Sequence, residues 1–287
     1  MIELSNSCLT AKISPTGAEL KSLKESATGI EYIWQSDPAI WNGASPVLFP
    51  IIGGLKNGVC CIKGKEYKIP PHGFVRKKTW KLISQSDAAA TFETLSDDTT
   101  RPLYPFEFIL RGHYVLNQSA VAIRYEVVNK DRERMLFSIG SHPAFNIPFA
   151  GGSIENYYVH FSQEEKMQRY FFKDGMHLNE TEPAFDNCRQ IYLKKNLFDR
   201  GPLIFKAPQS KTFTIMNSKN SKHINVKTGG VPFVALWAPP GAPFACIEPW
   251  YGIPDNIDTS GEFFEKEGIM NLETGCTFNT EYQIEIQ

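Results

Sequence analysis

The stretch FEFILRGHYVLNQSAVAIRYEVV, residues 106–128, decides the fold class. Two runs of alternating apolar and polar residues flank the turn-like sequence Asn117-Gln118-Ser119. In each run the apolar residues fall on one face: Phe106, Phe108, Leu110, Tyr114 and Leu116 in the first, and Val121, Ile123, Tyr125 and Val127 in the second. A period of two is typical of strands with one buried face, so these residues predict an antiparallel hairpin.

Short segments rich in β-branched and aromatic residues recur along the rest of the chain. Further strands are expected at 10–14, 89–95, 157–161, 212–216, 223–227, 231–237, 244–248 and 277–286. Only 37–41 and 261–268 have helical patterns, and both are short. Many short strands separated by turns predict an all-β fold, a large antiparallel sandwich or barrel whose function lies on a concave sheet face or at its rim.

The composition excludes several classes of protein. The 287 residues include 30 Lys+Arg and 31 Asp+Glu, so the chain has no general positive field for nucleic acid or for an anionic membrane surface. No stretch reaches the roughly 20 apolar residues of a membrane span, and the start lacks the pattern of a signal peptide. We therefore expect a cytoplasmic location and a small neutral or locally charged partner, with no nucleic acid and no membrane.

Proline and glycine occur as short punctuation, and no long Ser/Gly-rich run marks a boundary, so one domain over residues 1–287 is expected. The six cysteines show no CxxC or CxxH spacing, which favours reduced thiols. His113, His160, His177 and His223 also lack metal-ligand spacing, so no metal site is predicted. The sequence does not indicate an oligomeric state.

Two histidines stand in constrained segments. His72 lies in PPHGFVR (70–76), where prolines restrict the approach and glycine permits a turn directly after the imidazole. His142 precedes Pro143, which favours an extended backbone, and Phe145 nearby is a candidate apolar wall for a ring-shaped ligand. An imidazole titrates near neutral pH and can serve as acid or base. Each histidine, taken alone, also fits a purely structural role.

Glu248 ends an otherwise apolar strand face. In FACIE (244–248), alternation places Phe244, Cys246 and Glu248 on one side of the strand. If this carboxylate is partly buried, desolvation raises its pKa and makes it a better proton acceptor near neutrality. The alternative is a strand-end glutamate that reaches solvent or an arginine.

Eight segments together resemble the aldose 1-epimerase, or galactose mutarotase, family, and most closely its LacX-like subgroup. They are GAELKSL (17–23), EYIWQSDPAIW (31–41), PVLFPIIG (46–53), HGFVR (72–76), YPFEF (104–108), GSHPAFNIP (140–148), LFDRGPLIF (197–205) and CIEPWYGIPD (246–255). The resemblance implies a galactose mutarotase-like supersandwich, a β-sandwich with few helices. It also implies an isomerase in carbohydrate metabolism that interconverts the anomers of a free aldose without a cofactor.

The resemblance also implies roles for individual residues. Glu248 is the expected base at the C1 hydroxyl, His142 the acid at the ring oxygen, and His72 a hydrogen-bonding partner in the same region. Trp237 and Phe145 are expected to offer apolar faces to the sugar.

The chain departs from the subgroup at one position. Gly54 stands where the subgroup has an arginine after PVLFP, so Arg76 is expected to supply the guanidinium. For a substrate-binding aspartate the candidates are Asp255 and Asp199, and each also fits an ordinary turn. Two alternatives stay open, a hexose-phosphate 1-epimerase and a noncatalytic carbohydrate-binding protein.

Overall fold

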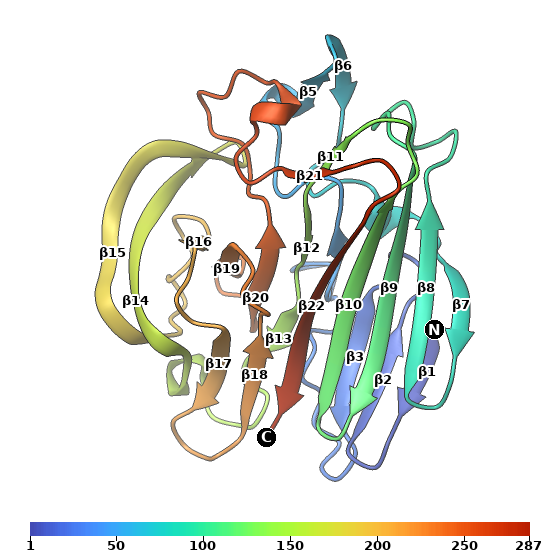
Figure 1. Cartoon of the computed structure of the whole chain (residues 1–287). Coiled ribbons are helices and arrows are strands. Elements are labelled where there is room, and N and C mark those ends of the chain that lie inside the picture. The colour runs from blue at the N-terminus through green and yellow to red at the C-terminus, as the bar shows by residue number, and fades with distance from the viewer.

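The computed structural model describes residues 1–287 and is built almost entirely from antiparallel strands (Figure 1). The predicted all-β class with few short helices is confirmed. The predicted hairpin is present, with Leu116 opposite Val121 and a two-residue turn between the strands. A single domain over the whole chain stays a prediction.

The larger sheet has nine strands in the order β15-β14-β17-β18-β22-β10-β9-β8-β7. Its strands are β7 (Lys81–Gln85), β8 (Ala89–Leu95), β9 (Phe108–Asn117), β10 (Ala120–Asn129), β14 (Tyr157–Lys173), β15 (Met176–Tyr192), β17 (Thr212–Asn217), β18 (His223–Lys227) and β22 (Thr277–Ile286). Strands β8, β18 and β22 have the bounds that their alternation predicts.

The smaller sheet has six strands and carries the site. Its order is β16-β19-β20-β12-β4, and β13 also pairs with β20. The bounds are β4 (Val47–Leu48), β12 (Ile139–Ser141), β13 (Ala144–Asn146), β16 (Leu203–Lys206), β19 (Phe233–Trp237) and β20 (Phe244–Tyr251). Because β20 has partners on both edges, its backbone is fixed along most of its length.

Three small sheets and four single helical turns complete the chain. The sheets are formed by β1 (Ile2–Ser5), β2 (Leu9–Ile13) and β3 (Leu20–Glu25), by β5 (Val59–Ile62) and β6 (Lys65–Lys68), and by β11 (Met135–Phe137) and β21 (Met270–Leu272). The helical turns are η1 (Lys56–Gly58), η2 (Val75–Lys77), η3 (Ile154–Asn156) and η4 (Phe263–Glu265). None of these turns has the length or apolar character needed to cross a bilayer.

The two predicted helices are shorter than expected. Residues 37–41 form one hydrogen-bonded turn, in which the N–H of Trp41 donates to the carbonyl of Asp37. Within 261–268 only η4 is helical. Helices this short lack the successive hydrogen bonds that offset nucleation, so tertiary contacts decide their form.

The hydrophobic interior divides between the two faces of the six-stranded sheet. Val234, Leu236 and Ile247 belong to a cluster of 67 buried residues, which also includes the inward side chains of the β9–β10 hairpin. Alternate residues on the same strands, including Phe233, Ala235 and Trp250, belong to a separate cluster of seven. The main part of the nine-stranded sheet therefore does not cover the second face of the six-stranded sheet, and other residues bury it.

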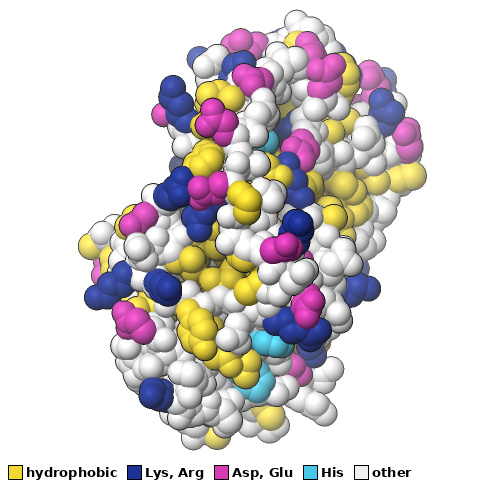
Figure 2. Space-filling view, turned by 90° about the vertical axis from the view of Figure 1, so that its left-hand side faces the viewer, with side chains coloured by type: hydrophobic (Ala, Val, Ile, Leu, Met, Phe, Trp, Pro, Cys, Tyr) yellow, Lys and Arg dark blue, Asp and Glu magenta, His cyan; other side chains and the backbone are white.

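Strands β14 and β15 form a long hairpin that arches beside this second face (Figure 1). Their pairing has several register shifts, which bend the strands. Phe172, near the end of β14, packs against the seven-residue cluster. The side of the molecule that bears the arch shows hydrophobic side chains gathered among charged ones (Figure 2). The arch thus encloses space over the six-stranded sheet.

Candidate active site

Strand register brings His142 and Glu248 together. Gly140 pairs with Trp250 and Ala144 pairs with Cys246, so the same register continues on both sides of Pro143. Extending that register places His142 directly opposite Glu248. Opposite residues of an antiparallel pair point to the same face and have neighbouring Cβ atoms. Two residues more than 100 positions apart are thus positioned by the backbone of the sheet.

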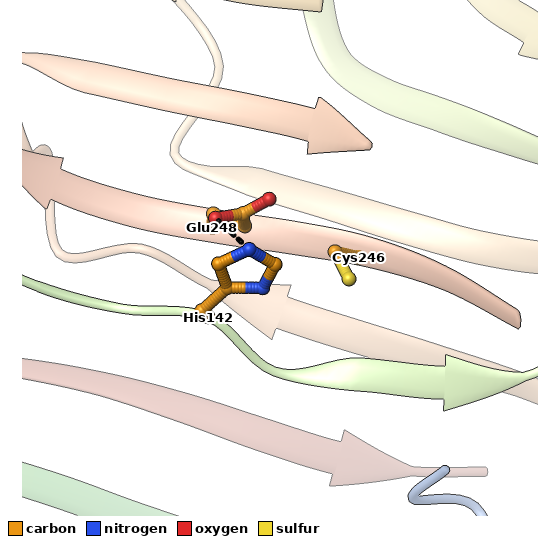
Figure 3. A group of neighbouring side chains, drawn as sticks. All are labelled: His142, Cys246 and Glu248. Atoms are coloured by element: carbon orange, nitrogen blue, oxygen red, sulfur yellow. Dashed lines mark ion pairs between the residues drawn. The ribbon is translucent and has the colours of Figure 1, made fainter. Parts of the chain in front are cut away.

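The two side chains are close and buried. His142 Nε2 lies 3.2 Å from Glu248 Oε2, and the residues are 7% and 1% exposed (Figure 3). The indole of Trp41 stacks on the imidazole with ring centroids 4.9 Å apart, and Trp237 meets its edge at 5.4 Å. Aromatic rings on two sides restrict the imidazole to one orientation.

Burial dominates the electrostatics of this pair. It raises the pKa of Glu248 well above its ordinary value, an effect that the neighbouring Trp250 indole opposes. It lowers the pKa of His142 well below its ordinary value, and His72 and Arg76 lower it further by charge repulsion. His142 Nδ1 and Glu248 Oε2 are buried without a hydrogen-bond partner. The free site therefore favours the uncharged forms of both groups.

His72 lies beside the pair in an unusual backbone conformation. Its φ is 62°, in the left-handed region, and its ring centroid is 5.6 Å from that of His142. Gly73 follows with φ 73°, and a Cβ there would lie 1.9 Å from the Phe49 carbonyl oxygen, so only glycine fits. The sequence PPHGF thus produces a turn that directs the imidazole.

A hydrogen bond fixes the tautomer of His72. The backbone N–H of Gly53 donates to Nδ1 at 3.2 Å, so the proton of the neutral ring resides on Nε2. Burial and the neighbouring Arg76 lower the pKa of His72 to about 3. At neutral pH His72 is an uncharged hydrogen-bond donor.

Arg76 lies on η2, one turn after His72. One Nη donates to the Pro71 carbonyl at 3.0 Å, while Nε is buried without a partner. Burial lowers the pKa of the guanidinium below its ordinary value. The guanidinium keeps unpaired donors that can bind a ligand.

These groups open into a cavity of about 300 Å³ between the sheet and the arch. It is lined by Trp41, Gly53, Gly54, Pro71, His72, Arg76, His142, Phe172, Asp174, Gly175, Pro202, Trp237, Glu248, Trp250 and Pro254. Five residues expected at the site are therefore brought together. They are the three expected catalytic residues, His72, His142 and Glu248, with Arg76 and Trp237. The volume is at the lower end of the range for small-molecule sites.

Sequence reasoning missed Trp41, Phe172 and Asp174. Trp41 stood inside a segment that carried the family resemblance, but its contact with His142 arises only in the folded chain. Phe172 and Asp174 come from the arch, where residues 162–192 show too little hydrophobic alternation to predict strands. The one local signal is the Asp174-Gly175 pair, a dipeptide that favours a two-residue hairpin turn, and the structure has that turn between Lys173 and Met176.

Phe145 and Asp255 do not lie in the cavity, which corrects two expectations. Phe145 is three positions from His142, so it points to the opposite face, where its ring is fully buried in the large cluster. Asp255 is 5% exposed and binds Lys266 Nζ at 2.7 Å and the N–H of Lys56 at 3.0 Å. Its carboxylate is paired within the protein and holds two loops together. The alternative, Asp199, lies in an exposed turn outside the cavity lining.

Gly54 faces the turn of the arch. A Cβ at this position would lie 3.5 Å from the carbonyl oxygen of Gly175. This is an ordinary van der Waals distance, so the β14–β15 turn lies next to residue 54 without excluding a side chain there. Arg76 is the only lysine or arginine in the cavity lining.

Cys246 lies beside His142 and Glu248, on the same strand as Glu248. His142, Cys246 and Glu248 are all buried, and their ligand atoms lie within 4.8 Å of one another (Figure 3). The sequence predicted no metal site because the only criterion was the spacing of candidate ligands along the chain. The structure assembles a nitrogen, a sulfur and a carboxylate from two strands, a donor set that is able to hold a transition metal.

Comparison with known proteins gives consistent matches. Residues 1–271 match the family described as aldose 1-epimerase. The plasmid-encoded Protein LacX of Lactococcus lactis subsp. lactis is 31% identical over 296 aligned positions, covering 99% of each chain. A galactose mutarotase related enzyme from Lactobacillus acidophilus is 33% identical with a TM-score of 0.95, covering 100% of this chain and 97% of that one. A galactose mutarotase-like protein from Lactobacillus casei is 28% identical with a TM-score of 0.91 and full coverage of both.

Proposed function

The chain belongs to the aldose 1-epimerase family, an isomerase family, and from this premise we propose that it interconverts the α and β anomers of a free hexose. The observation that carries the proposal is the buried acid–base pair, His142 opposite Glu248, at the wall of a sugar-sized cavity. The hydroxyl oxygen and the ring oxygen of a pyranose are bonded to the same carbon, so two neighbouring groups can reach both.

The reaction needs one base and one acid. Glu248 takes the proton of the C1 hydroxyl while His142 gives a proton to the ring oxygen. The bond between C1 and the ring oxygen breaks, and the C1 carbonyl forms. After rotation about the C1–C2 bond, the new hydroxyl attacks the other face of C1, His142 recovers its proton, and Glu248 returns the other. Each residue thus ends the cycle in the protonation state in which it began.

The pair reaches its active form without exchanging protons with solvent. Burial favours a protonated Glu248 and a neutral His142 in the free site. The reactive form, a carboxylate with an imidazolium, contains the same number of protons, and the two atoms concerned are 3.2 Å apart. Sugar hydroxyls that hydrogen-bond to the charged groups replace lost hydration and stabilise this form.

The surrounding residues orient the sugar. His72, protonated on Nε2, donates a hydrogen bond near the ring oxygen, and the free donors of Arg76 bind hydroxyls. Trp41, Trp237 and Phe172 present aromatic surface to the C–H groups of the sugar. Positioning of this kind reduces the entropy that the reaction must lose.

The charges of the cavity favour a free hexose over a hexose phosphate. Phosphate recognition ordinarily uses several cationic groups, and bidentate arginine is the strongest. The lining contains one arginine, no lysine, and the carboxylates of Asp174 and Glu248. A dianionic substrate would meet a single permanent cation, Arg76, with the carboxylate of Asp174 in the same lining.

The proposal is tested by polarimetry of freshly dissolved α-D-galactose and α-D-glucose. Anomer exchange of their 6-phosphates is measured by NMR. We expect acceleration of a free hexose that falls about 10²–10⁴-fold in Glu248→Gln and in His142→Asn, because each removes one proton-transfer group. Glu273→Gln, the same change at an exposed site, is the matched control. Absence of acceleration with every sugar, or an unchanged rate in Glu248→Gln, would refute the proposal.

A further inference from the structure

We propose that Cys246 joins His142 and Glu248 in a binding site for a thiophilic divalent cation such as Zn²⁺, and that the bound cation inhibits the enzyme by occupying both proton-transfer groups. The binding part stands on the geometry of the three side chains. The inhibitory part rests on the proposed function.

Backbone register explains why the three ligands meet. Cys246 and Glu248 are two positions apart on β20, so their side chains share a face, and His142 reaches that face from the paired segment (Figure 3). The site is therefore built on sheet backbone and not on a mobile loop. Rigid placement of ligands is what a metal site requires.

The distances are close to those of a zinc site. Zinc bonds of about 2.0–2.3 Å at tetrahedral angles place ligand atoms about 3.3–3.8 Å apart. His142 Nε2 and Glu248 Oε2 are already 3.2 Å apart, and the three ligand atoms lie within 4.8 Å of one another. A shift of about 1 Å by the sulfur, within reach of a change in its side-chain torsion, completes the triad.

The polar atoms of the site lack other partners. Glu248 Oε2 is buried and has no partner beyond its 3.2 Å contact with His142 Nε2, and Cys246 is 0% exposed. His142 itself is more than nine-tenths buried. A cation coordinated by a carboxylate and a thiolate is electrically neutral with them, which removes the penalty of burying isolated charges. The thiol proton of Cys246 and the carboxyl proton of Glu248 both leave to solvent as the metal binds.

The chemistry selects the type of ion. Sulfur and imidazole ligands favour Zn²⁺, Co²⁺ and Cd²⁺, whereas Mg²⁺ and Ca²⁺ prefer oxygen ligands. Three protein ligands leave a fourth position, which faces the cavity lined by His142 and Glu248. That position is where a sugar hydroxyl binds in the proposed reaction, so cation and sugar compete.

The test measures binding without reference to activity. Full-length protein is titrated with Co²⁺, and thiolate-to-metal charge-transfer absorption is recorded, with displacement by Zn²⁺ in a second titration. We expect one equivalent per chain, and loss of the charge-transfer band in Cys246→Ser. Removing even an outer partner of a metal ligand typically weakens affinity about 10–100-fold, so loss of the thiolate is expected to weaken Zn²⁺ binding at least that much.

Two controls keep the test decisive. Cys276→Ser removes an exposed thiol outside the cavity lining and should leave binding unchanged. If Cys246→Ser fails to fold by circular dichroism, Glu248→Gln removes a second ligand and should weaken Co²⁺ binding in its place. Unchanged Co²⁺ absorption in Cys246→Ser, or loss of binding in Cys276→Ser, overturns the site.

Mutarotation is then assayed with and without Zn²⁺, each variant relative to its own metal-free rate. We expect inhibition of the wild type that a chelator reverses and that Mg²⁺ does not reproduce. If Co²⁺ binds at Cys246 but neither the wild type nor any variant accelerates mutarotation, the proposed function is refuted and the metal site stands. Mutarotation that saturating Zn²⁺ does not slow would refute the inhibitory role.

Discussion

The two faces of the six-stranded sheet differ in how their buried polar groups are satisfied. On the face turned to the large core, the hydroxyl of Ser141 lies 3.2 Å from that of Tyr125 and 2.6 Å from that of Tyr282, within hydrogen-bond distance of both. On the other face, one residue further along the same chain, His142 Nδ1 is buried without a partner, as are Glu248 Oε2 and Trp250 Nε1.

This difference separates stability from function. A buried polar atom that lacks a partner typically costs about 1–3 kcal/mol. The core face avoids that cost at Ser141, whereas the site face carries it at His142 Nδ1, and Glu248 Oε2 has only its 3.2 Å contact with His142 Nε2. Groups that are unsatisfied in the free protein are available to a ligand, so the site face is arranged for binding and proton transfer at the expense of the folded state.

Glu248→Gln is expected to give the largest change in this comparison. The rate of mutarotation should fall about 10²–10⁴-fold while the fold becomes more stable. Because burial raises the carboxyl pKa above its ordinary value of 4.5, the folded state binds the proton more tightly than the unfolded state, and ionisation destabilises the fold as pH rises above 4.5. The stability gain of the variant, measured by urea unfolding, should therefore grow with pH above about 4.5. A less stable variant at pH 8 would contradict this account.

Ile247→Ala makes the opposite change on the adjacent residue. Its side chain is fully buried on the core face, so truncation should lower the free energy of unfolding by about 2–5 kcal/mol. The rate per folded molecule should remain near that of the wild type, measured at a temperature where the variant is folded. A rate loss as large as that of Glu248→Gln would show that the two faces are not separable.

Arg76→Ala tests a residue that binds without transferring protons. A hydrogen bond to a charged group is worth about 1.5–3 kcal/mol, so we expect KM to rise roughly 10–100-fold with a smaller change in kcat. Arg76→Lys keeps the charge and should recover part of the affinity. A loss of kcat with an unchanged KM in steady-state kinetics would instead place Arg76 in the chemical step.

His72→Asn tests the same comparison through the pH dependence of stability. Burial lowers the pKa of His72 from 6.5 to about 3, so the unfolded chain binds a proton that the folded protein does not. Wild-type stability is therefore lost as pH falls from about 6.5 towards 3. The variant should lose less over this window in thermal unfolding. His223→Asn, at a half-exposed histidine, is the control. Identical acid sensitivity of wild type and His72→Asn would contradict the lowered pKa.

The sequence predicted well where one face of a strand is buried. Strands 89–95, 223–227 and 277–286 alternate clearly and have the predicted bounds. The hairpin beyond residue 161 was missed because β14 and β15 are charged and mostly exposed there, which removes the periodic signal. The Asp174-Gly175 turn is the only local signal of this hairpin, and without flanking alternation it does not predict the two strands.

The sequence also predicted part of the candidate site. His72, His142, Glu248, Trp237 and Arg76 line one cavity because motifs and alternation fix their directions. Phe145 was misplaced although its odd spacing from His142 already placed it on the other face. The ion pair of Asp255 with Lys266 and the stacking of Trp41 on His142 depend on tertiary contacts, which a single sequence does not show.

The arch of β14 and β15 also has an evolutionary consequence. It meets the cavity through Phe172, Asp174 and Gly175 alone, while the proton-transfer pair is held by the register of β12, β13 and β20. Recombination, insertion or deletion within residues 162–192 would change which sugars fit and leave the chemistry in place. On the proposed function, evolution is thus expected to vary one wall of the sugar cavity through the arch without moving the acid–base pair, while Trp41, Arg76 and Trp237 form other parts of the same cavity.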